Sequence, residues 1–268
     1  MTRPVPKPVR AAVIGAGAIG TTVIGALRAG RLPGVEPVGF VNDRRTGDLG
    51  LPQISLAEAM ERADVIVECA GQTVIAQSGP TILDHGVDLL VTSVGALCDP
   101  EVAAALDAAG PGRYLITSGA VGGLDILTAA AAQAPFDRVS VTTVKLPETL
   151  VQPWMDEAAA DRLRRTAEPV EIFRGNAAEA TRLFPRSLNV AATVGWGVGD
   201  IGLVEVRLLG DPEAALTRHV IEAEGPCGSY RFEIANLPSA QNPRTSGVVP
   251  HAVLRSLGVL VGQPRGVI

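Results

Sequence analysis

The sequence is poor in several residue types, and each shortage narrows the range of possible functions. Only three cysteines occur among 268 residues, and they are far apart: Cys69, Cys98 and Cys227. An odd number without metal-ligand spacing argues against a disulfide framework or a zinc site and favours a reducing compartment. The chain also lacks an apolar run long enough to cross a bilayer. We therefore expect a cytoplasmic protein with no metal ion and no membrane partner.

Positive charge is scarce as well. The chain has 23 Lys and Arg against 28 Asp and Glu, a net charge of −5. This balance argues against a nucleic-acid partner, because binding to a phosphate backbone needs a basic surface. Lysine occurs only at Lys7 and Lys145, and only three histidines are present, so few side chains can exchange protons near neutral pH. With 47% hydrophobic residues, the chain can form one or two well-packed domains.

An apolar strand near the N-terminus runs into a G-x-G-x-x-G turn that opens a helix. In such a turn Gly15 makes the tight bend, Gly17 lets the backbone approach a pyrophosphate, and Gly20 allows the helix to pack closely on the strand. The helix, which includes Ala18 and Ile19, directs its unpaired N–H groups at the phosphates. We therefore predict that these five residues bind a dinucleotide cofactor.

The choice between NAD and NADP depends on the loop after the second predicted strand, Val38–Val41. Asp43 lies just past that strand, where a carboxylate can accept hydrogen bonds from the adenosine ribose. The same carboxylate repels a 2′-phosphate, whereas Arg44 and Arg45 are able to bind one. We predict NAD as the cofactor and keep NADP as the alternative.

Strands and helices alternate regularly over the first 120 residues. Strands are predicted at 11–14, 38–41, 64–70, 89–93 and 114–117, with helices at 21–28, 55–62, 74–83 and from Pro100 onward. This alternation predicts a parallel sheet with helices on both faces. Because the carboxyl ends of the strands line the ligand crevice, Ala70 and Gly71 are predicted to lie against the cofactor.

The pattern changes near Gly122, after which strands become more frequent. Helices are predicted at 123–134, 156–165, 177–183 and 189–194, and strands at 139–146, 203–209, 217–224 and 229–234. The fold class is therefore α/β, with an N-terminal Rossmann dinucleotide-binding domain and a C-terminal α+β catalytic domain. We place the first domain at 1–121 and the second at 122–240, and expect 241–268 to pack back on the first.

His219 lies in a stretch that alternates apolar and charged residues. On a strand, Thr217, His219, Ile221 and Ala223 share one face, and charged residues occupy the other. His219 therefore points to the apolar side, either as a satisfied core residue or as a catalytic one. The other two histidines fall at a helix end and inside the last predicted helix.

Two further polar residues have both a structural and a functional interpretation. Lys145 ends a predicted strand just before Pro147; it either binds a substrate carboxylate or reaches solvent. Asn189 begins a predicted helix, where it can serve as the N-cap. Alternatively, its amide lies near the nicotinamide and holds the carboxamide or a substrate oxygen.

A series of motifs along most of the chain resembles the L-aspartate dehydrogenase family. The motifs are Gly15–Gly20, Ser93–Leu97, Ser118–Asp125, Lys145–Pro147, Phe173–Ala177, Phe184-Pro185, Leu188–Ala192, Asp211-Pro212, His219 and Asn242–Ser246. The resemblance implies a catalytic domain built on an open mixed sheet and a homodimer. It also implies that His219 is the active-site residue and that Ala120 and Asn189 contact the cofactor.

The implied reaction is the NAD(P)-dependent oxidative deamination of L-aspartate to oxaloacetate and ammonia through iminoaspartate, or its reverse. His219 is suited to exchange the proton, and Lys145 and Thr217 are the predicted substrate residues. A role in supplying iminoaspartate to NAD biosynthesis follows from the same resemblance.

Two positions depart from the family pattern, and they motivate other functions. Thr217 stands where the family usually has asparagine, and Trp196 stands where it usually has a smaller residue. Both are expected close to the substrate pocket. The alternative is thus a related amino-acid dehydrogenase or imine reductase acting on another small amino or keto acid. A nucleotide-binding protein without catalysis is a third possibility.

Overall fold

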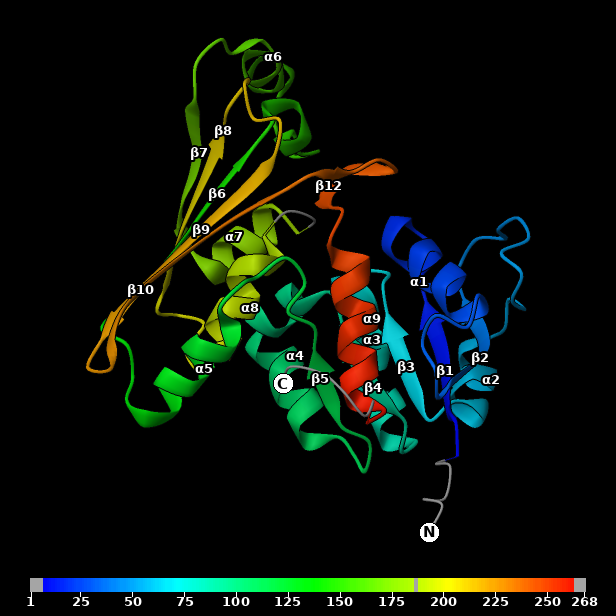
Figure 1. Cartoon of the computed structure of the whole chain (residues 1–268). Coiled ribbons are helices and arrows are strands. Elements are labelled where there is room, and N and C mark those ends of the chain that lie inside the picture. The colour runs from blue at the N-terminus through cyan, green and yellow to red at the C-terminus, as the bar shows by residue number, and fades with distance from the viewer. Residues whose placement is uncertain (1–6, 186–187, 263–268) are drawn as a thin grey trace. The chain divides into compact units, whose positions relative to one another are not determined.

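The computed structural model describes residues 7–185 and 188–262, and contacts divide the chain into two compact units (Figure 1). The first unit consists of Met1–Ser93, Glu101–Thr117 and Pro250–Ile268. The second consists of Val94–Pro100 and Ser118–Val249. No helix in the described ranges combines the length and apolarity needed to span a membrane.

The first unit is built on a parallel sheet of five strands in the order β2-β1-β3-β4-β5. The strands are β1 (Val9–Ile14), β2 (Val35–Val41), β3 (Val65–Glu68), β4 (Asp88–Val91) and β5 (Tyr114–Ile116). The helices that accompany them are α1 (Ala18–Arg28), α2 (Leu56–Arg62), α3 (Gln72–Asp84), α4 (Pro100–Ala108) and α9 (Val249–Leu260). The predicted alternation and parallel sheet are confirmed.

The strand order marks one position in this sheet as a candidate ligand site. The order reverses at β1, whose neighbours are β2 and β3, and right-handed crossovers then put helices on both faces. In open α/β sheets, ligands bind outside the carboxyl ends of the strands at such a reversal. The glycine turn that follows Ile14 lies at this point.

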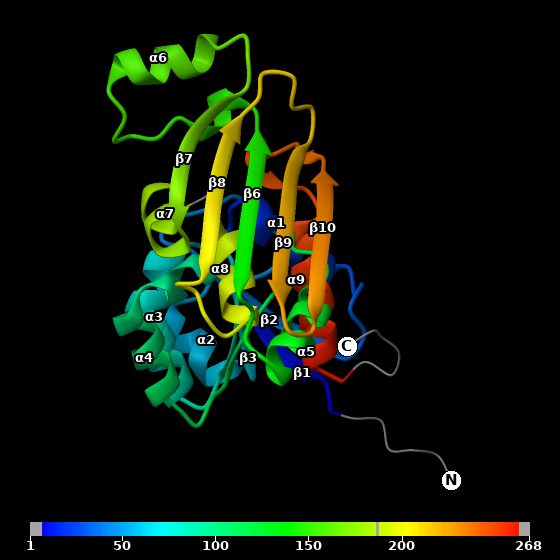
Figure 2. The same cartoon turned by 90° about the vertical axis from the view of Figure 1, so that its left-hand side faces the viewer.

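The second unit contains a mixed sheet of five strands in the order β10-β9-β6-β8-β7, seen in Figure 2. The strands are β6 (Arg138–Lys145), β7 (Val170–Asn176), β8 (Val204–Gly210), β9 (Thr217–Gly225) and β10 (Gly228–Asn236). Its helices are α5 (Leu124–Gln133), α6 (Glu157–Arg165), α7 (Ala177–Leu183) and α8 (Asn189–Gly197), with short 3₁₀ segments η1 (Val94–Cys98) and η2 (Pro147–Leu150). A small hairpin of β11 (Pro238–Ser239) and β12 (Asn242–Ser246) follows.

The two faces of this mixed sheet differ in character. The inner face carries the apolar core, including Val141, Val206 and Ile221. The outer face carries ion pairs between exposed side chains, such as Arg207 with Glu171. On β9 the predicted alternation is confirmed, because Thr217, His219, Ile221 and Ala223 are buried while their charged neighbours are exposed.

The division by contacts differs from the expected domain limits in three places, one of which is 118–121, expected in the first domain but part of the second unit. Residues 94–100 belong to the second unit, because η1 packs against α7 and α8. The segment before α9 also belongs there, because β12 packs against η2. The sequence analysis missed this hairpin, whose strands are too short to show an alternating pattern.

Candidate active site

The glycine turn after β1 contains two glycines that the fold itself requires. A Cβ on Gly15 would lie 2.7 Å from the carbonyl oxygen of Cys69, so the turn is packed against the end of β3. A Cβ on Gly20 would overlap the carbonyl oxygen of Gly15, which confines α1 close to β1. Both contacts are with backbone atoms, which cannot move aside as a flexible side chain can.

Gly17 has no such role in the fold. No atom lies within 4 Å of the position that its Cβ would occupy. This open space lies at the N-terminus of α1, which has no acidic residue in its first turn and whose first N–H groups lack helical partners. An anionic phosphate therefore fits beside Gly17, where the backbone at Ala18 and Ile19 can bind it.

A buried carboxylate organises the neighbouring loops. Glu68 ends β3 and is fully buried. Its Oε1 accepts hydrogen bonds from the N–H groups of Ala70 and Gly71, both at 2.7 Å, and its Oε2 accepts from those of Thr92 and Ser93 at 3.1 and 2.9 Å. Glu68 thus fixes the carboxyl ends of β3 and β4, which include the predicted cofactor residues Ala70 and Gly71. Glu68 was not predicted from the sequence, although a single acidic residue at the end of the apolar stretch Val65–Glu68 could have indicated a buried carboxylate.

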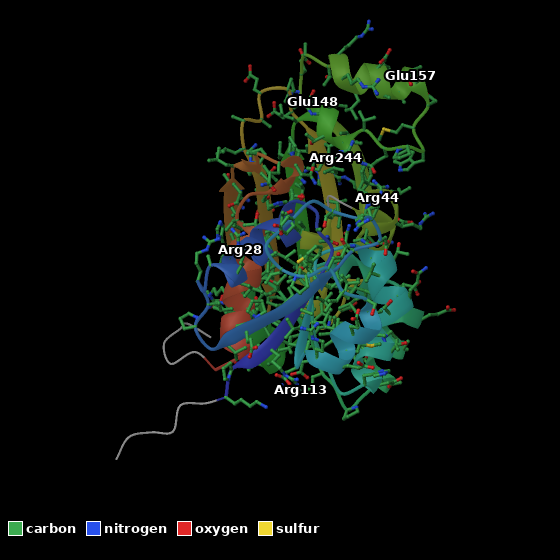
Figure 3. The ribbon with its side chains drawn as sticks, turned by 90° about the vertical axis from the view of Figure 1, so that its right-hand side faces the viewer. Arg28, Arg44, Arg113, Glu148, Glu157 and Arg244 are labelled. Carbon is green, nitrogen blue, oxygen red and sulfur yellow. The ribbon has the colours of Figure 1, made fainter. Side chains whose placement is uncertain are left out.

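The loop after β2 is tied to the glycine turn. Asn42 Oδ1 accepts a hydrogen bond from Ala16 N at 3.1 Å, and Gln53 Nε2 donates to the carbonyl oxygens of Asn42 and Arg44. These bonds fix the backbone, whereas the side chains of Asp43 and Arg44 are exposed. Arg44 is labelled in Figure 3. Both the carboxylate and the guanidinium are therefore available to an adenosine ribose.

In the second unit, four polar side chains lie together on the inner face of the sheet. Thr143 and Lys145 come from β6, and Thr217 and His219 come from β9, where His219 is paired with Thr143. All four are at most 4% exposed. The hydroxyl of Thr143 is 3.0 Å from His219 Nδ1. Burial, together with the charge of Lys145, lowers the pKa of His219 to about 3, so the imidazole is neutral near pH 7.

Lys145 is a buried cation. Its ammonium donates a hydrogen bond to the carbonyl oxygen of Arg244 at 2.8 Å, and none of the ion pairs in the described part of the chain includes it. Burial lowers its pKa to about 8. The interpretation that Lys145 reaches solvent is wrong, since only 4% of it is exposed. An unpaired buried ammonium is costly, and an anionic ligand would offset that cost.

Asn189 and Ala120 also lie in the second unit. The N-cap of α8 is Leu188, and Asn189 is the first helical residue, so the N-cap interpretation of Asn189 is wrong. Its Oδ1 instead accepts a hydrogen bond from Gly95 N at 3.0 Å and holds η1 against α8. Ala120 is buried in the apolar core of this unit.

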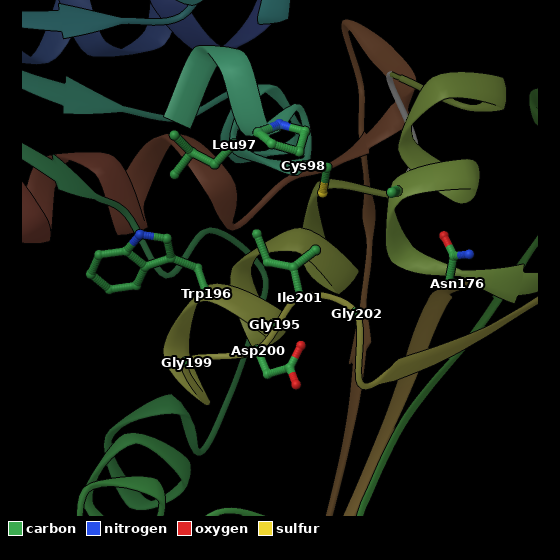
Figure 4. A pocket seen from close by; sticks show the side chains of 11 residues that line it. Leu97, Cys98, Asn176, Gly195, Trp196, Gly199, Asp200, Ile201 and Gly202 are labelled. Carbon is green, nitrogen blue, oxygen red and sulfur yellow. The ribbon is translucent and has the colours of Figure 1, made fainter. Parts of the chain in front are cut away.

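Trp196 lines a separate pocket of about 640 Å³ (Figure 4). Its other lining residues include Leu97, Cys98, Asp200 and Ile201, but none of the four polar residues on β6 and β9. Thr217 and Trp196 therefore lie in different parts of the second unit. Of these two residues, which differ from the family pattern, only Thr217 belongs to the cluster around His219.

Comparisons with known proteins agree with this arrangement. Residues 125–260 match the family model described as aspartate dehydrogenase, C-terminal, and residues 15–111 match that of the homoserine dehydrogenase NAD binding domain. The L-aspartate dehydrogenase of Methanopyrus kandleri is 37% identical over 264 residues, covering 92% of this chain and 94% of that protein. The chain belongs to the L-aspartate dehydrogenase family.

Two other relatives also match nearly the whole chain. The L-aspartate dehydrogenase of Pseudomonas aeruginosa is 35% identical over 257 residues, covering 92% of this chain and 95% of that protein. The crystal structure of an aspartate dehydrogenase from Thermotoga maritima superposes with a TM-score of 0.75 and 25% identity, covering 95% and 97% of the two chains. The family resemblance and the fold class predicted from the sequence are thus confirmed.

The glycine turn offers a test that separates a structural role from a cofactor role. Gly17 has φ −79° and ψ −168°, which alanine adopts readily, so Gly17→Ala should leave the melting temperature unchanged. We expect it to weaken NAD binding about tenfold, a loss of about 1.4 kcal/mol, because its methyl group occupies the phosphate space. Gly20→Ala is the matched comparison and should lower the melting temperature. Unchanged NAD affinity in Gly17→Ala, measured by fluorescence titration, would place the pyrophosphate elsewhere.

Proposed function

We propose that the protein is an NAD(P)-dependent L-aspartate dehydrogenase, which interconverts L-aspartate and oxaloacetate plus ammonia through iminoaspartate. The observation that carries the proposal is the buried cluster of His219 and Lys145, in a chain 37% identical to a relative named for this activity. A neutral imidazole and an unpaired ammonium are the two groups that an amino dicarboxylate needs: a proton acceptor and a carboxylate partner.

The reaction removes a hydride from Cα and a proton from the amino group, which leaves an imine. A bound nicotinamide supplies the hydride acceptor. His219, which is neutral, accepts the proton from the amine or from the water that adds to the imine carbon before ammonia leaves. Lys145 holds a substrate carboxylate, and Thr217, which is also buried on the inner face of the sheet, provides a further polar contact.

The proposed cofactor residues are those predicted from the sequence and from the family resemblance. The turn residues Gly15, Gly17 and Gly20, with Ala18 and Ile19, bind the pyrophosphate. Ala70 and Gly71, fixed by Glu68, face the cofactor from the carboxyl end of β3. Ala120 and Asn189 are kept as proposed cofactor contacts on the ground of the family resemblance alone.

NAD is the proposed cofactor because Asp43 lies just past the end of β2. In Asp43→Ser, the ratio of kcat/KM with NADP to that with NAD should rise, since the repulsion of a 2′-phosphate is removed. Arg44→Ser should lower the same ratio. Steady-state rates with each cofactor give the ratio directly, and a value that Asp43→Ser leaves unchanged would remove Asp43 from cofactor selection.

The decisive assay uses the purified protein in both directions. NADH formation is followed with L-aspartate at alkaline pH, and consumption of NADH or NADPH is followed with oxaloacetate plus ammonia. L-Glutamate and L-alanine serve as comparison substrates. Turnover that is specific for aspartate supports the proposal. Preference for another amino acid would instead support a related dehydrogenase, the alternative that Thr217 motivates.

We also propose a homodimer, as expected from the family resemblance. The chain mass is 27.6 kDa, so sedimentation equilibrium distinguishes one copy from two. The same proposal places the enzyme in the cytoplasm, where it would supply iminoaspartate to NAD biosynthesis.

A further inference from the structure

The last residue of β10, Asn236, has a buried amide nitrogen with no hydrogen-bond partner. In the part of the chain that the structure describes, only two buried side-chain polar atoms lack a partner: Asn236 Nδ2 and Thr92 Oγ1. A buried donor without an acceptor is destabilising, and such groups are rare in folded proteins. One explanation is that a ligand supplies the missing acceptor.

The strand register places Asn236 beside the polar cluster. In the antiparallel pair of β9 and β10, Asn236 is directly opposite Thr217, and Ile234 is opposite His219. Directly opposite residues share a face of the sheet, and Thr217 is on the buried inner face. The amide of Asn236 therefore lies on the face that carries His219.

Lys145 is the last residue of β6, the strand on the other side of β9. In the pair of β6 and β9, Thr143 is opposite His219 and Val144 is opposite Arg218. The pairing ends there, and Lys145 and Thr217 are the next residues along the two strands. Lys145 and the paired residues Thr217 and Asn236 therefore come from the same end of three adjacent strands, next to His219, and we refer to these three residues as a row.

The chemistry of this row is that of an anion site. Lys145 contributes an ammonium whose hydrogen bond to Arg244 uses only one of its three donors. Asn236 contributes an amide N–H₂ that has no acceptor. A carboxylate has two oxygens and no donor, so its oxygens can accept from groups of both kinds.

We propose that Asn236 Nδ2 and Lys145 Nζ together bind one carboxylate of the substrate, with Asn236 as a further specificity-determining residue. This inference rests on the proposed function, since it names the groups that select a dicarboxylate. It assigns the amide to β10, a strand to which the sequence analysis gave no functional residue.

Asn236→Leu tests the assignment, because leucine keeps a similar volume and removes the unpaired amide. We expect the KM for L-aspartate, and the Kd for the unreactive dicarboxylate succinate measured by calorimetry, to rise about tenfold or more, the loss of a hydrogen bond to a charged group. The kcat and the NAD affinity should change little. The melting temperature should stay the same or rise, because a buried unsatisfied donor has been removed.

Asn236→Asp and Ala235→Asp form a matched pair. The first places a second carboxylate in the row and should weaken succinate binding further. The second places it one residue away on the exposed outer face and should leave binding unchanged. A lower melting temperature in Asn236→Leu with unaltered succinate binding would show a structural role and overturn the inference.

The experiments distinguish a failure of the proposed carboxylate site from a failure of the proposed reaction. Wild-type protein that fails to oxidise L-aspartate, while Asn236→Leu weakens succinate binding, supports the carboxylate site and overturns only the proposed reaction. Wild-type turnover of L-aspartate with unchanged KM and succinate affinity in Asn236→Leu overturns the site alone.

Discussion

Replacing His219 with alanine is expected to lower kcat by about a hundredfold or more, the low end of the range for a lost acid–base group. His219 is the histidine that lies in the polar cluster, and its Nδ1 is held by Thr143 at 3.0 Å. This bond fixes the ring plane and leaves Nε2 to exchange the proton. NAD affinity should be unchanged, because the glycine turn belongs to the other unit.

The pH dependence of the wild-type enzyme adds a second readout. Since burial lowers the pKa of His219 to about 3, the imidazole stays neutral throughout the range from pH 5 to pH 8. The rate should therefore show no step near pH 6.5, where an unperturbed histidine titrates. His251→Ala is the control, because His251 is exposed on α9. Turnover in His219→Ala that matches this control would exclude His219 from the reaction.

The parts of the fold that sequence predicted well are those with local signals. The helix predicted at 55–62 is present as α2, and Ser55 and Glu58 form a capping box at its start, a signal that depends only on residues three positions apart. The two-residue alternation on β9 correctly put His219 on the buried face. In both cases the prediction needed only residues that are close together in the sequence.

The features that sequence missed depend on residues far apart in the chain. Asn189 suits an N-cap position, yet its amide binds Gly95, 94 residues earlier. Asn236 gains its place from strand pairing with Thr217, which no local pattern specifies. For Lys145 the sequence left open whether it binds a substrate carboxylate or reaches solvent, and its burial and its hydrogen bond to Arg244, 99 residues away, exclude the second interpretation. The residues that come together in the candidate site are therefore determined by strand pairing and by contacts between segments far apart in the sequence.

Lys145→Met is expected to raise the KM for L-aspartate by about thirtyfold or more, since loss of one partner from a buried charge pair costs about 2 kcal/mol or more. Methionine fills a similar volume without the charge. In the wild type, the KM should also rise above about pH 8, where Lys145 loses its proton and with it the attraction to the carboxylate. In Lys145→Met the KM should lack this rise.

Stability provides an independent check with a defined sign. The pKa of Lys145 is lowered from 10.5 to about 8 in the folded protein, so between these values the unfolded chain binds the proton and the folded chain does not. The free energy of unfolding of the wild type therefore increases as the pH rises through this window, by an amount on the order of 3 kcal/mol. Lys145→Met should lack this increase and should be more stable than the wild type at pH 7.

The remaining lysine supplies the matched control. Lys7 is exposed near the N-terminus, so Lys7→Met should retain both the wild-type KM and the pH-dependent gain in stability. Urea unfolding at pH 7, 8, 9 and 10 measures the stability of the three proteins. A gain that persists in Lys145→Met would mean that another group releases the proton. An unchanged KM in the same variant would show that the substrate carboxylate is bound without this ammonium, which would leave the buried charge without a function in the reaction.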